Sequence, residues 1–137
     1  IYTLPLHDAL PILYTRIHAA DGTPSLLLGP LAVLPAHQNS GVGAALNRQG
    51  IAQARESGET ALFVYGDPRY YGRFGYSADA VAGVVPPQPY FAPGWQALTL
   101  DDGPLRATAG PIRVPAALMP EHMWSVPEED LPPLNEL

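Results

Sequence analysis

The positions of apolar residues between 13 and 35 predict a β-hairpin. "LYTRIHAA" (13–20) alternates between apolar and polar residues as a half-buried strand does, and "DGT" (21–23) is typical of a turn. The run "SLLLGPLAVLP" (25–35) is almost continuously apolar, which indicates a central strand. Gly29 and Pro30 interrupt this run, and because proline removes a donor from the strand ladder, we expect a bulge or a splay point there.

A helical pattern follows from about Ser40 to Ser57, because apolar residues recur there every three or four positions. Either Asn39 or Ser40 is expected as the N-cap, and Gly58 is expected to end the helix. "ALFVYG" (61–66) is then a short buried strand. A strand, a helix and a strand in this order predict a βαβ unit, in which the helix begins at the carboxyl end of the first strand.

The second half of the chain is richer in proline and less periodic. "DPRYYGRF" (67–74) indicates a short helix or turn that Asp67 can cap, with Pro68 at its first position. Residues 77–90 and 95–114 are predicted to form two strands, paired in antiparallel fashion. The tail from Pro115 is acidic and proline-rich, and we expect it to wrap the surface or to be partly mobile.

The first twelve residues, "IYTLPLHDALPI", need separate treatment. They lack a basic segment followed by a long apolar core, so they do not form a signal peptide. The stretch "LHDALPI" resembles the translation of a common sequencing-adapter oligonucleotide, and His7 and Asp8 are therefore left out of functional reasoning. The predicted organisation is a non-native segment at 1–12, one partial domain at 13–118 and a C-terminal tail at 119–137.

Composition narrows the range of functions. With 137 residues, the chain fits one domain that buries a core without disulfides. Seven Lys and Arg against thirteen Asp and Glu give a net charge of -6, which argues against a nucleic-acid or anionic-membrane partner. There is no cysteine and no apolar run long enough to span a membrane. We therefore predict a soluble protein, and the absence of cysteine is compatible with the cytoplasm, which is the predicted location. The histidines show no metal-ligand spacing, so no metal is expected.

Two glycines, Gly41 and Gly43, lie at the start of the predicted helix in "LPAHQNSGVGAALNRQG" (34–50). The first turn of a helix offers unpaired N–H groups and a positive dipole end, so this segment suits a phosphate. A Walker loop requires Gly-Lys-Ser/Thr, and Gly43 is followed by two alanines. A dinucleotide fingerprint requires a third glycine where Leu46 stands, which leaves that interpretation weak.

A third pattern, Gln/Arg-x-x-Gly-x-Gly/Ala, is satisfied by Gln38, Gly41 and Gly43. Together with "GDPRYYGRFGY" (66–76), this segment resembles the GNAT superfamily of N-acetyltransferases over roughly residues 13–118. The resemblance implies an α/β fold with a mixed, splayed sheet, helices on both faces, and an N-terminal strand and helices that are missing here. It also implies transfer of an acetyl group from acetyl-CoA directly to a primary amine.

The resemblance also implies roles for particular residues. Backbone N–H groups at the bend of the fourth family strand would hold the pantetheine arm and polarise the acetyl carbonyl, and Tyr71 would protonate the departing thiolate. The pyrophosphate would lie on the N–H groups at the start of the helix. The residues expected at the cofactor are Leu31, Ala32, Val33, Gln38, Asn39, Ser40, Gly41, Val42, Gly43 and Ala44. Arg69 and Arg73 are expected to face solvent or the phosphates.

Several alternatives stay open at the level of sequence. Asp67 is a candidate general base, but it serves equally well as a helix cap. Relatives commonly carry a glycine and a basic residue where Asn39 and Ser40 stand. The acceptor is a small-molecule or peptide amine, and a homodimer is compatible with the resemblance. Because the family's acceptor half is absent, the chain is alternatively a non-catalytic acyl-CoA-binding module or an inactive fragment, and a nucleotide-binding domain is a third candidate.

Overall fold

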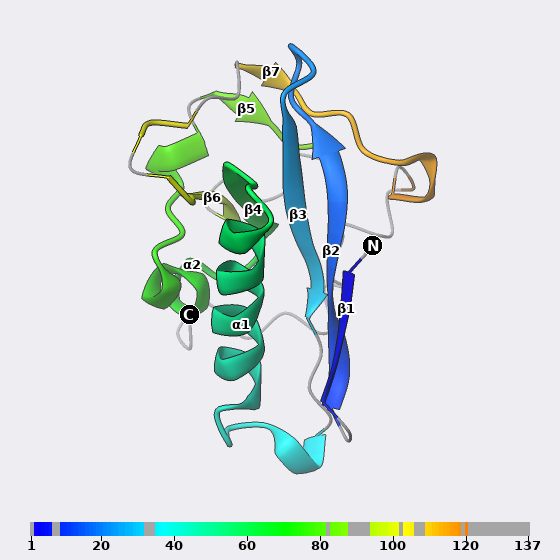
Figure 1. Ribbon diagram of the computed structural model, residues 1–137, viewed down its shortest axis with the longest axis vertical. Coiled ribbons are helices and arrows are strands. Elements are labelled where there is room, and N and C mark those ends of the chain that lie inside the picture. Colours follow the sequence, from blue (N-terminus) through cyan, green and yellow to red (C-terminus); the bar gives the residue numbers. More distant parts are fainter. Residues whose placement is uncertain are drawn as a thin grey trace.

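A central five-stranded β-sheet organises the protein (Figure 1). The computed structural model describes residues 2–6, 9–31, 35–81, 83–87, 94–101, 103–105, 109–118 and 120. The sheet has the strand order β1-β2-β3-β4-β6. Its strands are β1 (Tyr2–Leu6), β2 (Ala9–His18), β3 (Pro24–Leu31), β4 (Ala61–Tyr65) and β6 (Trp95–Thr99). Only β3 and β4 pair in parallel, so the sheet is mixed.

The predicted hairpin is confirmed, and its bulge is where the sequence indicates. Ile12 lies opposite Leu31 and Tyr14 lies opposite Leu28, so β3 carries one extra residue in the stretch that contains Gly29 and Pro30. The parallel register with β4 covers only Leu26 to Leu28. The end of β3 therefore continues beyond its parallel pairing with β4. Ala32 and Val33, which follow directly, lie outside the described residues.

Helix α1 (Val42–Glu56) connects β3 to β4 and completes the predicted βαβ unit. Its start differs from the expectation, because the N-cap is Gly41 rather than Asn39 or Ser40. Asn39 and Gly41 both have positive φ, at 58° and 85°, so a turn fills these positions. The Ser40 hydroxyl donates to the His37 carbonyl, in the 3₁₀ helix η1 (Pro35–His37), instead of capping α1.

The end of α1 agrees with the expectation for Gly58. This residue has φ of 75° and donates its N–H to the Arg55 carbonyl at 3.0 Å. The N–H of Glu59 donates to the Ala54 carbonyl at the same distance, which completes a Schellman motif. Glycine is the residue that adopts this left-handed conformation at least cost.

The second half contains less strand than predicted. The short helix α2 (Pro68–Tyr71) forms as expected and continues into the 3₁₀ helix η2 (Gly72–Phe74). Parts of the two antiparallel strands predicted at 77–90 and 95–114 lie outside the described residues, at 82, 88–90, 102 and 106–108. In the described parts the predicted length is wrong, because β6 covers only the start of the second range and two further strands have two residues each. These are β5 (Val84–Val85) and β7 (Gly110–Pro111), which pair in parallel as a separate sheet. Antiparallel pairing of Ser77 survives only as an isolated bridge to Ala97.

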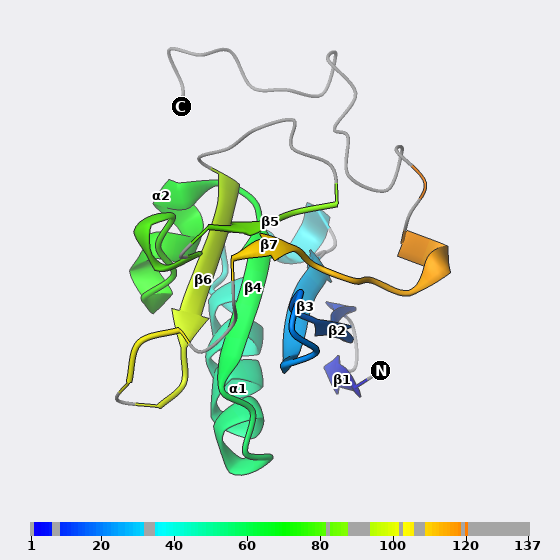
Figure 2. The same cartoon turned by 90° about the horizontal axis from the view of Figure 1, so that it is seen from above.

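The two faces of the main sheet bury separate apolar clusters. Figure 2 shows how helix α1 and strands β5 and β7 are arranged around this sheet. One face packs against α1, with Tyr71 and Phe74 partly buried at its margin. Three segments cover the other face. They are β5, through Val84, the residue after β7, Ile112, and the 3₁₀ helix η3 (Asp79–Val81). Helical segments thus lie on both faces, α-helical on one and 3₁₀ on the other. A further 3₁₀ helix, η5 (Ala116–Leu118), follows β7.

The stretch expected to be non-native is part of the sheet. Tyr2–Leu6 forms β1, which pairs with β2 in antiparallel fashion, and Ile12 is fully buried. Its origin in an adapter stays a prediction, because any alternating apolar sequence can add a strand to a sheet edge. His7 and Asp8 lie outside the described residues, and so does the tail from 121 to 137.

Candidate functional site

A cleft of about 750 Å³ opens where β3 ends, α1 begins and α2 follows β4. It joins the two sequence segments that were singled out, although they are separated by the whole of α1 and β4. The lining residues are Leu31, His37, Gln38, Asn39, Gly41, Val42, Gly43, Ala44, Asp67, Tyr70, Tyr71 and Arg73. Ser40 is not among them, and Ala32 and Val33 lie outside the described residues. The cleft therefore gathers most of the predicted site in one place.

The start of α1 forms one wall of the cleft. The first hydrogen bond of the helix runs from the Ala45 N–H to the Gly41 carbonyl at 3.0 Å. The N–H groups before Ala45 have no partner inside an α-helix, and Gly41 supplies no side chain to cap them. A helix of 15 residues adds the positive end of its dipole at this point. This wall is suited to bind an anionic group through the backbone of Val42 to Ala44.

Tyr71 forms the opposite side of the cleft, at the end of α2. Its ring meets Tyr70 edge-on with 5.0 Å between ring centroids, and Tyr76 with 5.7 Å. Burial, with a smaller contribution from Tyr70, raises the pKa of Tyr71 to about 12. The phenol is therefore protonated throughout the neutral range, and it can donate a hydrogen bond or a proton into the cleft.

A backbone frame behind Tyr71 was missed by the sequence analysis. Gln96 on β6 is 1% exposed, and its Nε2 donates to the Gly66 carbonyl at 3.1 Å and to the Gly94 carbonyl at 3.3 Å. The Gly66 N–H donates to the same Gly94 carbonyl at 2.9 Å. The available signal was a single amide in the otherwise apolar "WQAL", since a buried polar side chain needs such partners.

Asp67 acts as the cap of α2. Its Oδ1 accepts from the Arg69 N–H at 2.8 Å, and its Oδ2 lies 2.9 Å from Arg69 Nη2. The hydrogen bond from the Arg69 side chain holds the pKa of Asp67 below its usual range. A carboxylate with a lowered pKa is a weaker base, so the structure favours the capping role over the role of general base.

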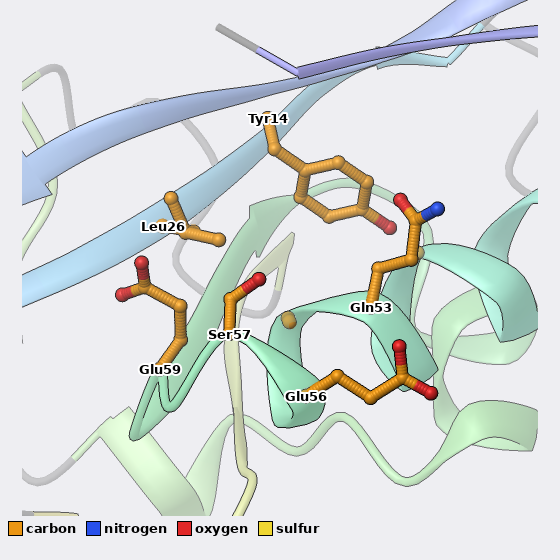
Figure 3. A pocket seen from close by; sticks show the side chains of 8 residues that line it. Tyr14, Leu26, Gln53, Glu56, Ser57 and Glu59 are labelled. Carbon is orange, nitrogen blue, oxygen red and sulfur yellow. The ribbon is translucent and has the colours of Figure 1, made fainter.

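A second hollow, of about 290 Å³, lies near the other end of α1 (Figure 3). Tyr14 reaches from β2 towards the helix, where its hydroxyl lies against Gly50. At the rim, Glu59 is paired with Arg16 at 2.6 Å between Oε1 and Nη2. This hollow contains neither the helix start nor Tyr71, so it does not share the chemistry of the cleft.

Within the described part of the chain, no group of three His, Cys, Asp or Glu residues is placed to hold a metal ion. Among the same residues, no helix has the length and apolar character that a membrane-crossing segment needs.

Comparison with known proteins identifies the fold. No family model matches the chain. The chain is 46% identical over 50 residues to the protein of Escherichia coli K12 named uncharacterized N-acetyltransferase YjhQ. The matched stretch covers 36% of this chain and 28% of YjhQ. The structure resembles the GNAT family N-acetyltransferase YhbS from Escherichia coli, solved in complex with CoA. That match has a TM-score of 0.69 and 23% identity over 76% of this chain and 58% of YhbS.

A GNAT family acetyltransferase from Brucella melitensis, solved in complex with acetyl-CoA, matches with a TM-score of 0.60. Sequence identity is 29% over 79% of this chain and 59% of that one. The chain thus spans less than two thirds of each of these relatives. The predicted resemblance to GNAT acetyltransferases is confirmed in both sequence and structure, and the α/β fold is the GNAT fold.

Proposed function

We propose that this chain is the cofactor-binding part of a GNAT-type N-acetyltransferase, which transfers an acetyl group from acetyl-CoA directly to a primary amine. The observation that carries the proposal is the cleft itself. It brings together an uncapped helix start, which suits the phosphates of CoA, and a buried, protonated tyrosine, which suits the sulfur that leaves. The CoA and acetyl-CoA complexes of the structural relatives support the same ligand.

The residues of the cleft fit the ligand. The N–H groups from Val42 to Ala44 would hold the pyrophosphate, with Gly41 and Gly43 leaving room for a close approach. Gln38 and Asn39 line the same wall. The nearest carboxylate in the cleft, Asp67, is neutralised by Arg69 and does not oppose an anionic ligand. The backbone at Leu31, where β3 has left its pairing with β4, would contact the pantetheine arm.

Tyr71 would serve the chemical step. The amine nitrogen forms a bond to the acetyl carbonyl carbon while the bond from that carbon to sulfur breaks. Tyr71 donates a proton to the sulfur that leaves, and the amine gives up one of its own protons. Burial keeps the phenol protonated at neutral pH but also makes it a weaker acid than a free tyrosine, so we expect the proton to move as the carbon–sulfur bond breaks and negative charge develops on sulfur. Reprotonation from solvent restores the phenol. The group that takes the proton from the amine stays unassigned, since Asp67 serves as a cap.

A second candidate function is a non-catalytic acyl-CoA-binding module or an inactive fragment. It is favoured by the pairing of Asp67 with Arg69, because this pairing leaves no assigned general base among the residues that line the cleft. Both candidates bind acetyl-CoA and differ only in turnover. A small-molecule or peptide amine as acceptor, a homodimer and a cytoplasmic location remain predictions.

Titration calorimetry with acetyl-CoA and, separately, with NAD tests the proposal. We expect binding of acetyl-CoA and none of NAD, because the chain lacks the third glycine of a dinucleotide fingerprint. Release of CoA thiol in the presence of a panel of amines then separates the enzyme from the binding module. Absence of acetyl-CoA binding would remove both candidates, and binding of NAD would favour a nucleotide-binding domain instead.

A further inference from the structure

Two arginines and two aromatic rings form a cluster beside the cleft. The Arg73 guanidinium carbon lies 4.5 Å from the centroid of the Tyr70 ring and 5.5 Å from that of Phe74. The guanidinium carbon of Arg48, on α1, also lies 5.5 Å from the Phe74 centroid. We call these four residues, Arg48, Tyr70, Arg73 and Phe74, the arginine cluster. It brings a cation from α1 and a cation from η2 to one ring.

Arg73 is held in a defined orientation. Its Nε donates to the Tyr70 carbonyl at 3.2 Å while its plane lies over the Tyr70 ring, and its side chain lines the cleft. This bond uses one of the five guanidinium N–H donors. Stacking and one backbone bond therefore fix Arg73 in advance, which lowers the entropy lost when a ligand binds to its remaining donors.

The charge of the cluster is not balanced by a carboxylate in the part of the chain that is described. There, the ion pairs join Arg16 to Glu59 and Arg69 to Asp67. Arg48 and Arg73 take part in neither pair, although the chain carries thirteen acidic residues against seven basic ones. Both positive charges act on the Tyr70 hydroxyl, where they oppose the rise in its pKa that burial causes. Both guanidinium groups thus contribute positive potential around the Tyr70 hydroxyl, which favours an anion beside them.

We propose that the arginine cluster binds the ribose 3′-phosphate of coenzyme A. This assignment rests on the proposed function. The pyrophosphate is assigned to the backbone at the start of α1, so the cluster is left for a second anion. A phosphate monoester carries a charge between about -1.5 and -2 near neutral pH, more than each phosphate of a pyrophosphate diester, and it offers three acceptor oxygens. Two guanidinium groups match this charge and geometry.

The test compares acetyl-CoA with acetyl-3′-dephospho-CoA, which differ only in this phosphate. Both ligands are titrated into the wild-type chain and into the variants Arg73→Gln, Arg48→Gln and Arg55→Gln. Arg55 is the matched control, because it is an exposed arginine in the last turn of α1 and does not line the cleft. Circular dichroism of each variant checks that it is folded.

We expect the wild-type chain to bind acetyl-CoA about tenfold or more tightly than the dephospho compound, the scale of one charge-assisted hydrogen bond. Arg73→Gln should remove most of this preference, because it should weaken the binding of acetyl-CoA but not that of the dephospho compound. Arg48→Gln should remove part of the preference, and Arg55→Gln should leave it unchanged. The preference should also shrink at high salt, since the cluster is open to solvent.

Three results would overturn the assignment. Equal affinity of the wild-type chain for the two ligands would mean that the phosphate lies free in solvent. If Arg73→Gln weakened the binding of both ligands equally, Arg73 would either contact the pyrophosphate or serve to stabilise the fold. Failure of the wild-type chain to bind either ligand would remove the proposed function itself, and this outcome is distinct from equal binding of both.

Discussion

Gly66 lies so close to Tyr71 that a Cβ on Gly66 would overlap the Tyr71 ring at Cε2. The absence of a side chain at the end of β4 therefore sets where the proposed proton donor sits. Gln96 holds the Gly66 carbonyl from the neighbouring strand, so the backbone cannot easily move aside. The position of Tyr71 is thus determined by two residues that do not themselves line the cleft.

Gly66→Ala should displace Tyr71. We expect the substitution to cost about 1–3 kcal/mol of the free energy of unfolding, the usual cost of overpacking, and to lower turnover more than it lowers affinity for acetyl-CoA. Thermal unfolding and steady-state kinetics measure the two effects. Gly72→Ala is the control, because its Cβ would meet nothing within 4 Å and its backbone is right-handed helical. That variant should gain about 0.4–1 kcal/mol.

Tyr71→Phe should lower turnover by about 10²-fold or more while affinity for acetyl-CoA stays within a few fold, since it removes only the proton donor. The burial that raises the pKa of Tyr71 to about 12 also predicts the alkaline behaviour of the wild-type chain. Loss of activity from deprotonation of this phenol should centre near pH 12 rather than near 10. A parallel loss of turnover and affinity in the variant would instead indicate a structural role.

The sequence predicted the elements whose patterns are local. The bulge at Gly29 and Pro30, the βαβ unit and the end of α1 at Gly58 each follow from a few neighbouring residues, and all three are present. The start of α1 was misplaced, because Asn39 and Ser40 have good capping side chains. In the structure Asn39 has a left-handed backbone and the Ser40 hydroxyl donates to the His37 carbonyl, so Gly41 is the N-cap instead.

The candidate site was predictable where it rests on a motif and not where it rests on contacts between distant segments. Gln38, Gly41 and Gly43 were singled out from a spacing pattern and Tyr71 from the resemblance to the family, and all four lie in one cleft, although their roles stay predictions. Gln96 carried only a faint signal, the single amide in "WQAL", and Arg48 carried none, because each contacts a residue from another element. Of the strands expected from 77 to 114, β6 extends the sheet as a short edge strand, whereas Val84 and Ile112 cover the second face of the sheet instead of lengthening a strand.

Gly41→Glu should abolish acetyl-CoA binding, because it places a negative charge and a side chain at the proposed pyrophosphate seat. Gly41 has φ of 85°, so any L-residue there also strains the backbone. Gly58→Glu is the matched control, since Gly58 has φ of 75° at the far end of the same helix and lies outside the cleft. Calorimetry should show lost binding only at position 41, and comparable affinity in both variants would contradict the assignment.

Stability should fall steeply in alkaline solution because burial raises the pKa of Tyr71 to about 12 and raises those of Tyr14 and Tyr76 as well. A pKa that is higher in the folded state than in the unfolded state means that the folded chain holds its proton more tightly. Stability from this source is fully present below about pH 10, the pKa of an unfolded tyrosine, and is lost as the pH rises through the folded values. Urea unfolding at a series of pH values, followed with phenolate absorbance, measures the effect. Tyr76→Phe should reduce the slope above pH 10, and an unchanged slope would show that the Tyr76 hydroxyl is not buried.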